Sequence, residues 1–191
     1  MAYCTVADVK TYLGVSEADD DALIATLINA AQAAIDAHTG NTFEAAVDAV
    51  RYYDVHGPHI EGRRLYFDRP LASLTSISDG GGAYQATDYV MMPRNDAPYY
   101  GVELKLTTGR YWTYVTDWEN AIAVTGRWAY SVSAPNDIRQ AARRLAAFYY
   151  RQKDAPLQDV TAIEAGVVVQ PIAMPADVRA LLSPYRAPVV L

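Results

Sequence analysis

Near the start of the chain, apolar residues recur at intervals of three and four positions, which predicts two helices in succession. The apolar side of the first helix consists of Val6, Val9 and Leu13. Thr5 is placed to cap its free backbone N–H groups, and Asp8 occupies the third helical position, as in a capping box. Gly14 can adopt the left-handed conformation that ends a helix. A short capped helix is therefore expected over residues 5–14.

A second helix is predicted to follow at once, with Ser16 as its cap. Its first turns are rich in carboxylates, which the positive end of the helix dipole favours: Glu17, Asp19, Asp20 and Asp21. This run leads straight into apolar helix and lacks the alternating oxygen ligands and the mid-loop glycine of an EF-hand. Helix capping, and not calcium binding, is expected there. The sequence Thr-Gly-Asn-Thr-Phe at 39–43 ends the helix.

One side of this second helix is apolar at 100° per residue. Its members are Leu23, Ile24, Leu27, Ile28, Ala31, Ala34 and Ile35. Alanine at positions 30, 31 and 34 keeps this side thin, so another helix can approach closely. That helix belongs either to the same chain or to a neighbouring copy, and the sequence leaves both possibilities open.

After Phe43 the pattern changes to short β-branched and aromatic runs separated by turn residues, which indicates antiparallel strands. The predicted strands are 50–55, 64–67, 71–78, 88–92, 101–106 and 121–130. Helical spacing returns after Pro135, with a buried side formed by Ile138, Ala141, Ala142, Leu145, Phe148 and Tyr149. A variable stretch follows at 153–170. Pro175 then opens a last short helix that stops at Ser183 and Pro184.

This order predicts an α+β fold in which N-terminal and C-terminal helices form a small bundle with an inserted antiparallel β region. We expect a single domain over residues 1–191. It comprises a helical hairpin at 1–43, the β region at 44–133, and C-terminal helices with a tail at 134–191.

Composition narrows the class of protein. The chain has 191 residues, of which 51% are hydrophobic and 20% charged, and these values are typical of a globular protein. The single cysteine, Cys4, excludes an internal disulfide, and the start of the chain lacks a signal-peptide pattern, so a reducing cytosol is expected. No apolar run reaches membrane-spanning length. The formal charge of −6 argues against tight wrapping of nucleic acid.

Candidate chemistry is sparse. His56, His59 and Glu61 could in principle hold zinc in a small hydrolase, but Gly57 and Pro58 between the two histidines are ordinary turn sequence, so a surface loop is favoured. His38 is placed to complement the negative end of the second helix. The sequence holds neither a phosphate-binding Gly-Lys-Ser/Thr loop nor a Gly-x-Ser-x-Gly elbow. We therefore expect no enzymatic activity, no metal and no cofactor.

Two sets of side chains indicate contacts with other molecules. The β region concentrates aromatic residues, which suit either a core and interface or an alternative function, a carbohydrate-binding module. These are Tyr99, Tyr100, Tyr111, Trp112, Tyr114, Trp118, Trp128 and Tyr130. The helix after Pro135 carries arginines on both flanks of its apolar side, and arginine suits ion pairs at interfaces. These are Arg139 and Arg143 on one flank and Arg144 and Arg151 on the other.

Motifs at both ends of the chain support a family resemblance. They are Thr-Val-Ala-Asp-Val-Lys-Thr-Tyr-Leu-Gly-Val at 5–15, the acidic stretch, the apolar helix, and His-Thr-Gly-Asn-Thr-Phe at 38–43. Near the other end, Pro-Asn-Asp-Ile at 135–138 opens a helix to Arg151, and Met-Pro-Ala-Asp-Val at 174–178 leads to Leu-Leu-Ser-Pro-Tyr-Arg at 181–186. In this order the chain resembles the head-tail connector (adaptor) family of tailed bacteriophages. Compact members of that family are mostly helical, so the β region looks like an enlarged insertion.

The resemblance implies a structural virion protein at the head-tail junction, assembled in the host cytoplasm. It implies a homo-oligomeric ring of about twelve copies beneath the portal protein. A tail or neck completion protein would be a further partner, and genome DNA would pass through the ring without sequence-specific binding. No membrane is implied. As candidate interface residues we select Leu27, Ala31, Ala34, Arg139, Arg143, Arg144, Arg151, Tyr185 and Arg186.

Overall fold

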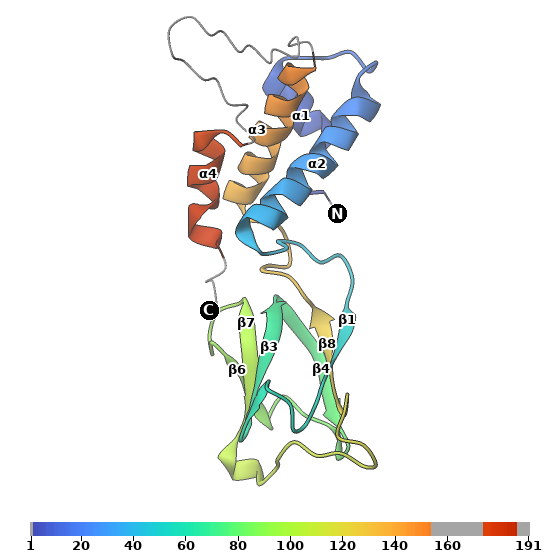
Figure 1. Ribbon diagram of the computed structural model, residues 1–191, viewed down its shortest axis with the longest axis vertical. Helices are drawn as coiled ribbons and strands as arrows, with labels where there is room; N and C mark the ends of the chain where they lie inside the picture. Colours follow the sequence, from blue (N-terminus) through green and yellow to red (C-terminus); the bar gives the residue numbers. More distant parts are fainter. Residues whose placement is uncertain (1, 154–173, 187–191) are drawn as a thin grey trace, which may run out of the picture. The chain divides into compact units, whose positions relative to one another are not determined.

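A computed structural model describes residues 2–153 and 174–186. It divides into two compact units (Figure 1), one of residues Asn41–Ala134 and the other of Ala2–Gly40 together with the chain from Pro135 onward. The first is built from antiparallel strands and the second from helices, which confirms the α+β class. Whether the two units fold as one domain stays a prediction.

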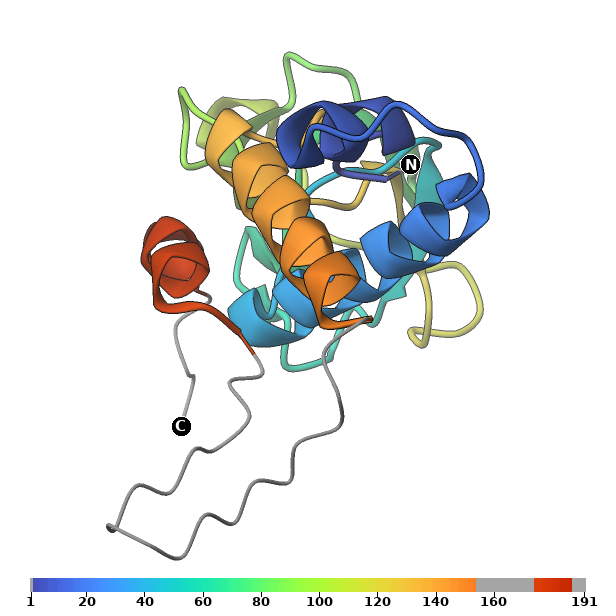
Figure 2. The ribbon, with the colours of Figure 1, turned by 90° about the horizontal axis from the view of Figure 1, so that it is seen from above.

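The helical unit contains α1 (Val6–Leu13), α2 (Asp21–Thr39), α3 (Asn136–Gln152) and α4 (Ala176–Leu182), followed by a 3-10 turn at Ser183–Tyr185. α3 contacts the other three helices. Figure 2 shows it between α4 on one side and α1 and α2 on the other. Its buried side includes Ala141, Ala142 and Ala146, which are fully excluded from solvent and let the neighbouring helices approach closely. None of the described helices is long and apolar enough to span a membrane.

The ends of α1 confirm the predicted capping. The Asp8 amide donates to Thr5 Oγ1 at 3.1 Å, and the Thr5 amide donates to Asp8 Oδ2 at 2.8 Å, which completes a capping box. Gly14 ends the helix with φ of 74°, in the left-handed region where glycine carries no steric penalty.

The predicted start of α2 was wrong. The helix begins at Asp21, not directly after Ser16, and Asp20 precedes it without a side-chain capping bond. The Asp20 carboxylate is bound elsewhere, because it accepts hydrogen bonds from Tyr150 Oη and Lys153 Nζ at the end of α3. A tertiary contact has therefore replaced the local cap.

The apolar side of α2 is narrower than predicted. Its buried members are Ile24, Ile28, Ala31, Ile35 and Thr39. Leu23 is 38% exposed, so its inclusion among the buried residues was wrong. On α3, Phe148 and Tyr149 are only half-buried, whereas Ala146 and Ala147 are buried in their place. The larger side chains lie toward the edges of both helices, and alanine occupies the close contacts.

The β unit consists of two four-stranded antiparallel sheets that share one core. The first has the order β1 (Ala49–Tyr53), β8 (Ile122–Arg127), β4 (Ser73–Asp79) and β5 (Gly82–Ala83), and the second has the order β2 (Ile60–Glu61), β3 (Arg64–Leu71), β7 (Tyr99–Leu104) and β6 (Tyr89–Met92). Residues that alternate along the strands, such as Leu65 and Phe67 or Ile122 and Val124, point into this core. The six predicted strands correspond to β1, β3, β4, β6, β7 and β8, whereas the two-residue strands β2 and β5 were missed.

The two sheets are joined where β3 continues almost directly into β4. Only Ala72 separates them, and its amide donates to the carbonyl of Arg127 at 2.8 Å. Beside this corner, a Cβ added to Gly126 would lie 2.3 Å from the backbone oxygen of Ser73. Glycine is thus required for the close approach of β8 to the corner.

Candidate assembly interface

The four arginines of α3 that the sequence singled out differ in their partners within the chain. Arg144 pairs with Asp177 of α4 at 2.8 Å, so its charge is used within the chain. Arg151 is exposed near the end of the helix. Arg139 and Arg143 have no carboxylate within ion-pair distance in the described part of the chain, and they lie together in the first half of α3.

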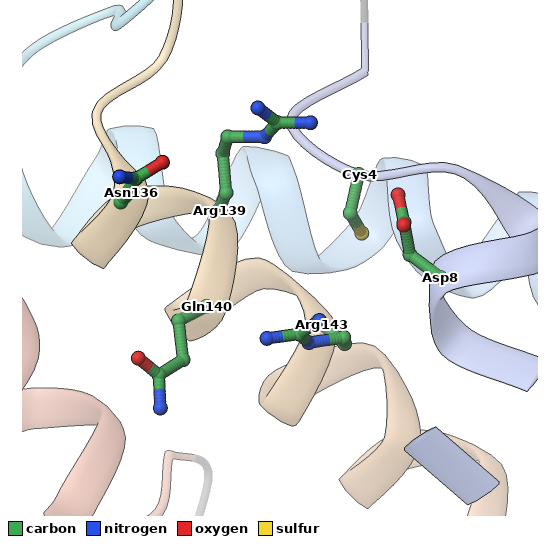
Figure 3. Close-up of a pocket in the computed structure, with 6 residues that line it drawn as sticks. All are labelled: Cys4, Asp8, Asn136, Arg139, Gln140 and Arg143. Carbon is green, nitrogen blue, oxygen red and sulfur yellow. The ribbon is translucent and has the colours of Figure 1, made fainter. Parts of the chain in front are cut away.

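These two arginines line a pocket of about 240 Å³ on the helical unit. Its other lining residues are Cys4, Asp8, Asn136 and Gln140. Figure 3 shows Arg139 and Arg143 on α3, opposite Cys4 and Asp8 at the start of α1. Residues 136, 139, 140 and 143 share one face of α3 because they are spaced by three and four positions.

The opposite wall is fixed by the segment that precedes α1. Tyr3 is 2% exposed, and its hydroxyl donates to Asp36 Oδ1 of α2 at 2.5 Å. This contact holds the segment against the bundle and buries Cys4 beside the capping box of α1. Sequence reasoning missed Cys4, Asn136 and Gln140 as members of a site, and it assigned Asp8 only a capping role.

The two titratable groups on that wall are held in defined charge states. Burial, followed by the nearby charge of Asp8, raises the pKa of the Cys4 thiol to about 11. The hydrogen bonds from the backbone and side chain of Thr5 lower the pKa of Asp8, and Arg139 and Arg143 lower it further. At neutral pH the wall therefore presents a neutral thiol and a carboxylate whose oxygen Oδ2 is bound by Thr5.

Arg143 is held more tightly than Arg139. Its guanidinium lies 5.9 Å from the ring centre of Tyr12 on α1, and its Nε is buried with no hydrogen-bond acceptor in the described residues. Leaving a buried guanidinium nitrogen unpaired is unfavourable. Two arginines against one carboxylate leave the pocket with a net positive charge, which suits an incoming carboxylate.

The remaining predicted interface residues are dispersed over the unit. Ala31 is fully buried within the unit, so its contacts are made by the chain itself. Leu27 and Ala34 are half-buried on α2. Tyr185 donates to Asp137 Oδ2 at 3.3 Å beside the start of α3, and Arg186 is exposed.

The histidine pair lies in the loop between β1 and β2, in contact with aromatic rings. The ring centre of His59 lies 5.3 Å from that of Tyr53, and exposed His56 lies 5.6 Å from Tyr114 and 6.0 Å from Trp118. Within residues 2–153 and 174–186, no three His, Cys, Asp or Glu side chains gather in a group that could hold a metal ion.

The aromatic residues of the β unit do not form one platform. Trp112 is 6% exposed in the core, and its Nε1 donates to the carbonyl of Arg63 at 3.2 Å. Trp128 packs edge-on against Phe67 at 5.2 Å between ring centres. Tyr111, Tyr114 and Trp118 are exposed on the long connection between β7 and β8. The aromatic composition thus serves mainly the sandwich core and its surface loops.

Comparison with known proteins gives both fold and family. No curated protein sequence matches the chain. Three solved structures share its fold: "Neck of empty GTA particle computed with C6 symmetry" (TM-score 0.60, 20% identity), "Neck of native GTA particle computed with C12 symmetry" (0.59, 21%) and "Virion of native gene transfer agent (GTA) particle" (0.57, 20%). Each match covers 97% of this chain and 90% of the other. A family model described as head completion protein matches residues 2–187. The chain therefore belongs to the head completion protein family, which indicates a structural virion protein and not an enzyme.

Proposed function

We propose that this protein forms a ring beneath the portal of a tailed, phage-like particle, where it joins the DNA-filled head to the tail. Membership of the head completion family supports a structural role at the neck. The similar neck structures were computed with C6 and C12 symmetry, which is the symmetry of a closed ring. A ring of about twelve copies is therefore proposed for this chain, with assembly in the host cytoplasm and residence in the virion.

The observation that carries the proposal is the pocket of Arg139 and Arg143. A protein with a formal charge of −6 keeps two arginines together without an ion pair in the described part of the chain. Arginine forks suit ion pairs at interfaces, so such a pair supports an assembly contact better than a solitary protein.

The acidic character of the chain supports a second part of the proposal, that genome DNA passes through the ring without sequence-specific binding. Tight binding of DNA rests on neutralising phosphates, and a chain of formal charge −6 offers few cations in excess for this purpose. We propose that Arg151, Tyr185 and Arg186 contact the portal or the tail-side partner. Leu27 and Ala34 are proposed to contribute apolar area between copies.

Light scattering across a concentration series, alone and with the portal ring of the same genome, tests the proposal. We expect either a closed ring of the free protein or a ring that forms only on the portal. Electron microscopy of the complex would give the copy number. A protein that stays monomeric at all concentrations and does not bind the portal would refute the proposed function.

A further inference from the structure

The helical unit carries, besides the pocket of Arg139 and Arg143, an acidic loop that precedes α2. Glu17 and Asp19 in this loop are exposed and form no ion pair with any described residue. Their neighbours differ, because Asp20 pairs with Lys153 at 2.5 Å and Asp21 pairs with Lys10 at 2.7 Å. Glu17 and Asp19 are therefore the carboxylates of this segment with no cation among the described residues.

The pocket and the acidic loop lie at different ends of α3. The contact between Asp20 and Lys153 fixes the loop beside the C-terminal end of α3, whereas the pocket is lined by residues of the first half of α3. Lys153 is roughly 15 Å further along the helix than Arg143, at 1.5 Å rise per residue. Figure 1 shows the start of α2 near the end of α3 and away from the start of α3. The arginines of the pocket and the unpaired carboxylates of the loop therefore lie at different ends of α3, with exposed Arg151 at the same end as the loop.

Opposite charges at two separate places on one surface favour head-to-tail contacts between identical copies. Such contacts generate a ring when the rotation between successive copies closes. Building on the proposed ring, we infer that the pocket of each copy binds the acidic loop of the next copy, with Glu17 and Asp19 as the carboxylates that reach Arg139 and Arg143.

The chemistry of the pocket fits a carboxylate from outside. A guanidinium can bind a carboxylate through its terminal nitrogens, and Arg139 and Arg143 line this pocket without an ion pair to any described residue. The amides of Asn136 and Gln140 border the same space and can donate further hydrogen bonds. Cys4 stays neutral, and Asp8 supplies a single negative charge against two arginines, so the pocket keeps an excess of positive charge.

Reversal of charge on each side of the contact gives a direct test. One variant carries Arg139→Glu with Arg143→Glu, and the other carries Glu17→Arg with Asp19→Arg. In either variant alone, like charges meet at every contact, so the concentration for half-assembly in light scattering should rise at least about 100-fold. Arg179→Glu on the exposed side of α4 is the matched control and should assemble like the wild type.

An equimolar mixture of the two variants tests whether the acidic loop, and not another acidic segment, binds in the pocket. The reversed pocket of one variant fits the reversed loop of the other, and the unchanged pocket fits the unchanged loop, so an alternating ring should form at near wild-type concentration. Two monomeric variants whose mixture does not assemble would overturn the inference and direct attention to an acidic segment of the portal. Wild-type assembly by either variant would also overturn it.

Folding of the variants needs a separate control because Arg143 is half-buried. The far-UV circular dichroism spectrum of each variant should match that of the wild type, and the milder pair Arg139→Glu and Asp19→Arg repeats the test with exposed residues only.

If the wild type assembles only on the portal, assembly of the same mixtures is measured on the portal ring. A wild-type ring that ignores all charge reversals refutes this contact and leaves the proposed function intact, whereas a wild type that never forms a ring refutes both.

Discussion

The Asp79→Ala substitution should destabilise the β unit by about 3 kcal/mol, because one carboxylate holds the long β7–β8 connection against the turn after β4. Asp79 Oδ1 accepts from the Gly81 amide at 2.8 Å, and Oδ2 accepts from the Thr113 amide at 2.8 Å and from the Tyr84 hydroxyl at 2.5 Å. Tyr84 is 6% exposed, and burial together with Asp79 raises its pKa well above the ordinary value.

The magnitude follows from these three bonds. A hydrogen bond to a charged group contributes about 1.5–3 kcal/mol when shielded from water and less when exposed. Asp79 is half-buried and two of its donors are at the surface, so about 1 kcal/mol for each bond is a reasonable value. Asp79→Asn keeps one acceptor oxygen and should cost less than Asp79→Ala. The Tyr84 hydroxyl also lies 3.2 Å from the carbonyl of Tyr111 and can donate its single proton there once Asp79 is replaced, which limits the loss.

Urea unfolding followed by tryptophan fluorescence measures this effect selectively. All three tryptophans lie within residues 41–134, so fluorescence reports the β unit, whereas circular dichroism at 222 nm reports mainly the helices. Asp117→Ala is the matched control, since among the described residues Asp117 accepts a single hydrogen bond, from the Glu119 amide at 3.3 Å in the same connection. An Asp79→Ala midpoint equal to that of Asp117→Ala would refute the idea that Asp79 anchors the connection.

Three further predictions concern other parts of the molecule. Gly126→Ala should destabilise the β unit by roughly 3 kcal/mol in the same fluorescence assay, because its Cβ would meet the carbonyl of Ser73 at 2.3 Å. Cys4, with a pKa of about 11, should react with a disulfide reagent at pH 8 roughly 100-fold more slowly than an ordinary thiol, measured by absorbance. Because the hydrogen bonds of Thr5 lower the pKa of Asp8 in the folded protein, the capping box stabilises fully above about pH 4 and its contribution is lost as the pH falls through the folded pKa. The stability difference between wild type and Asp8→Asn, measured at 222 nm, should therefore decrease as the pH is lowered below about 4.

The sequence predicted the elements of the fold well where local signals were strong. Thr5 and Gly14 mark both ends of α1, and Pro135 and Pro175 directly precede α3 and α4. Strong alternation of apolar and polar residues identified six of the eight strands. The start of α2 was misjudged because Tyr150 and Lys153, the partners of Asp20, lie 130 and 133 residues away, and local capping rules cannot anticipate those contacts.

The pocket was less predictable than the helices that build it. Helical spacing identified Arg139 and Arg143 as neighbours on α3, but it equally grouped Arg144 with Arg151, and only the packing of α4 separates the paired arginine from the unpaired ones. The other wall depends on residues before α1, where Tyr3 reaches Asp36 of α2. No periodic pattern records such a contact, because it joins a non-helical segment to a helix more than thirty residues away.

The pairing of charges within the helical unit explains why the unpaired residues point to assembly. Three cations at the contacts of α1, α3 and α4 meet a carboxylate: Lys10 with Asp21, Arg144 with Asp177, and Lys153 with Asp20. Surface ion pairs of this kind add little stability individually, so their main effect is to neutralise the charges that the packed helices present. The pocket of Arg139 and Arg143 and the carboxylates Glu17 and Asp19 of the acidic loop are not neutralised in this way, and they lie at different ends of α3. Within a single copy, the acidic loop could reach the pocket only if the contact between Asp20 and Lys153 were broken. A second copy can instead place its acidic loop in the pocket of the first.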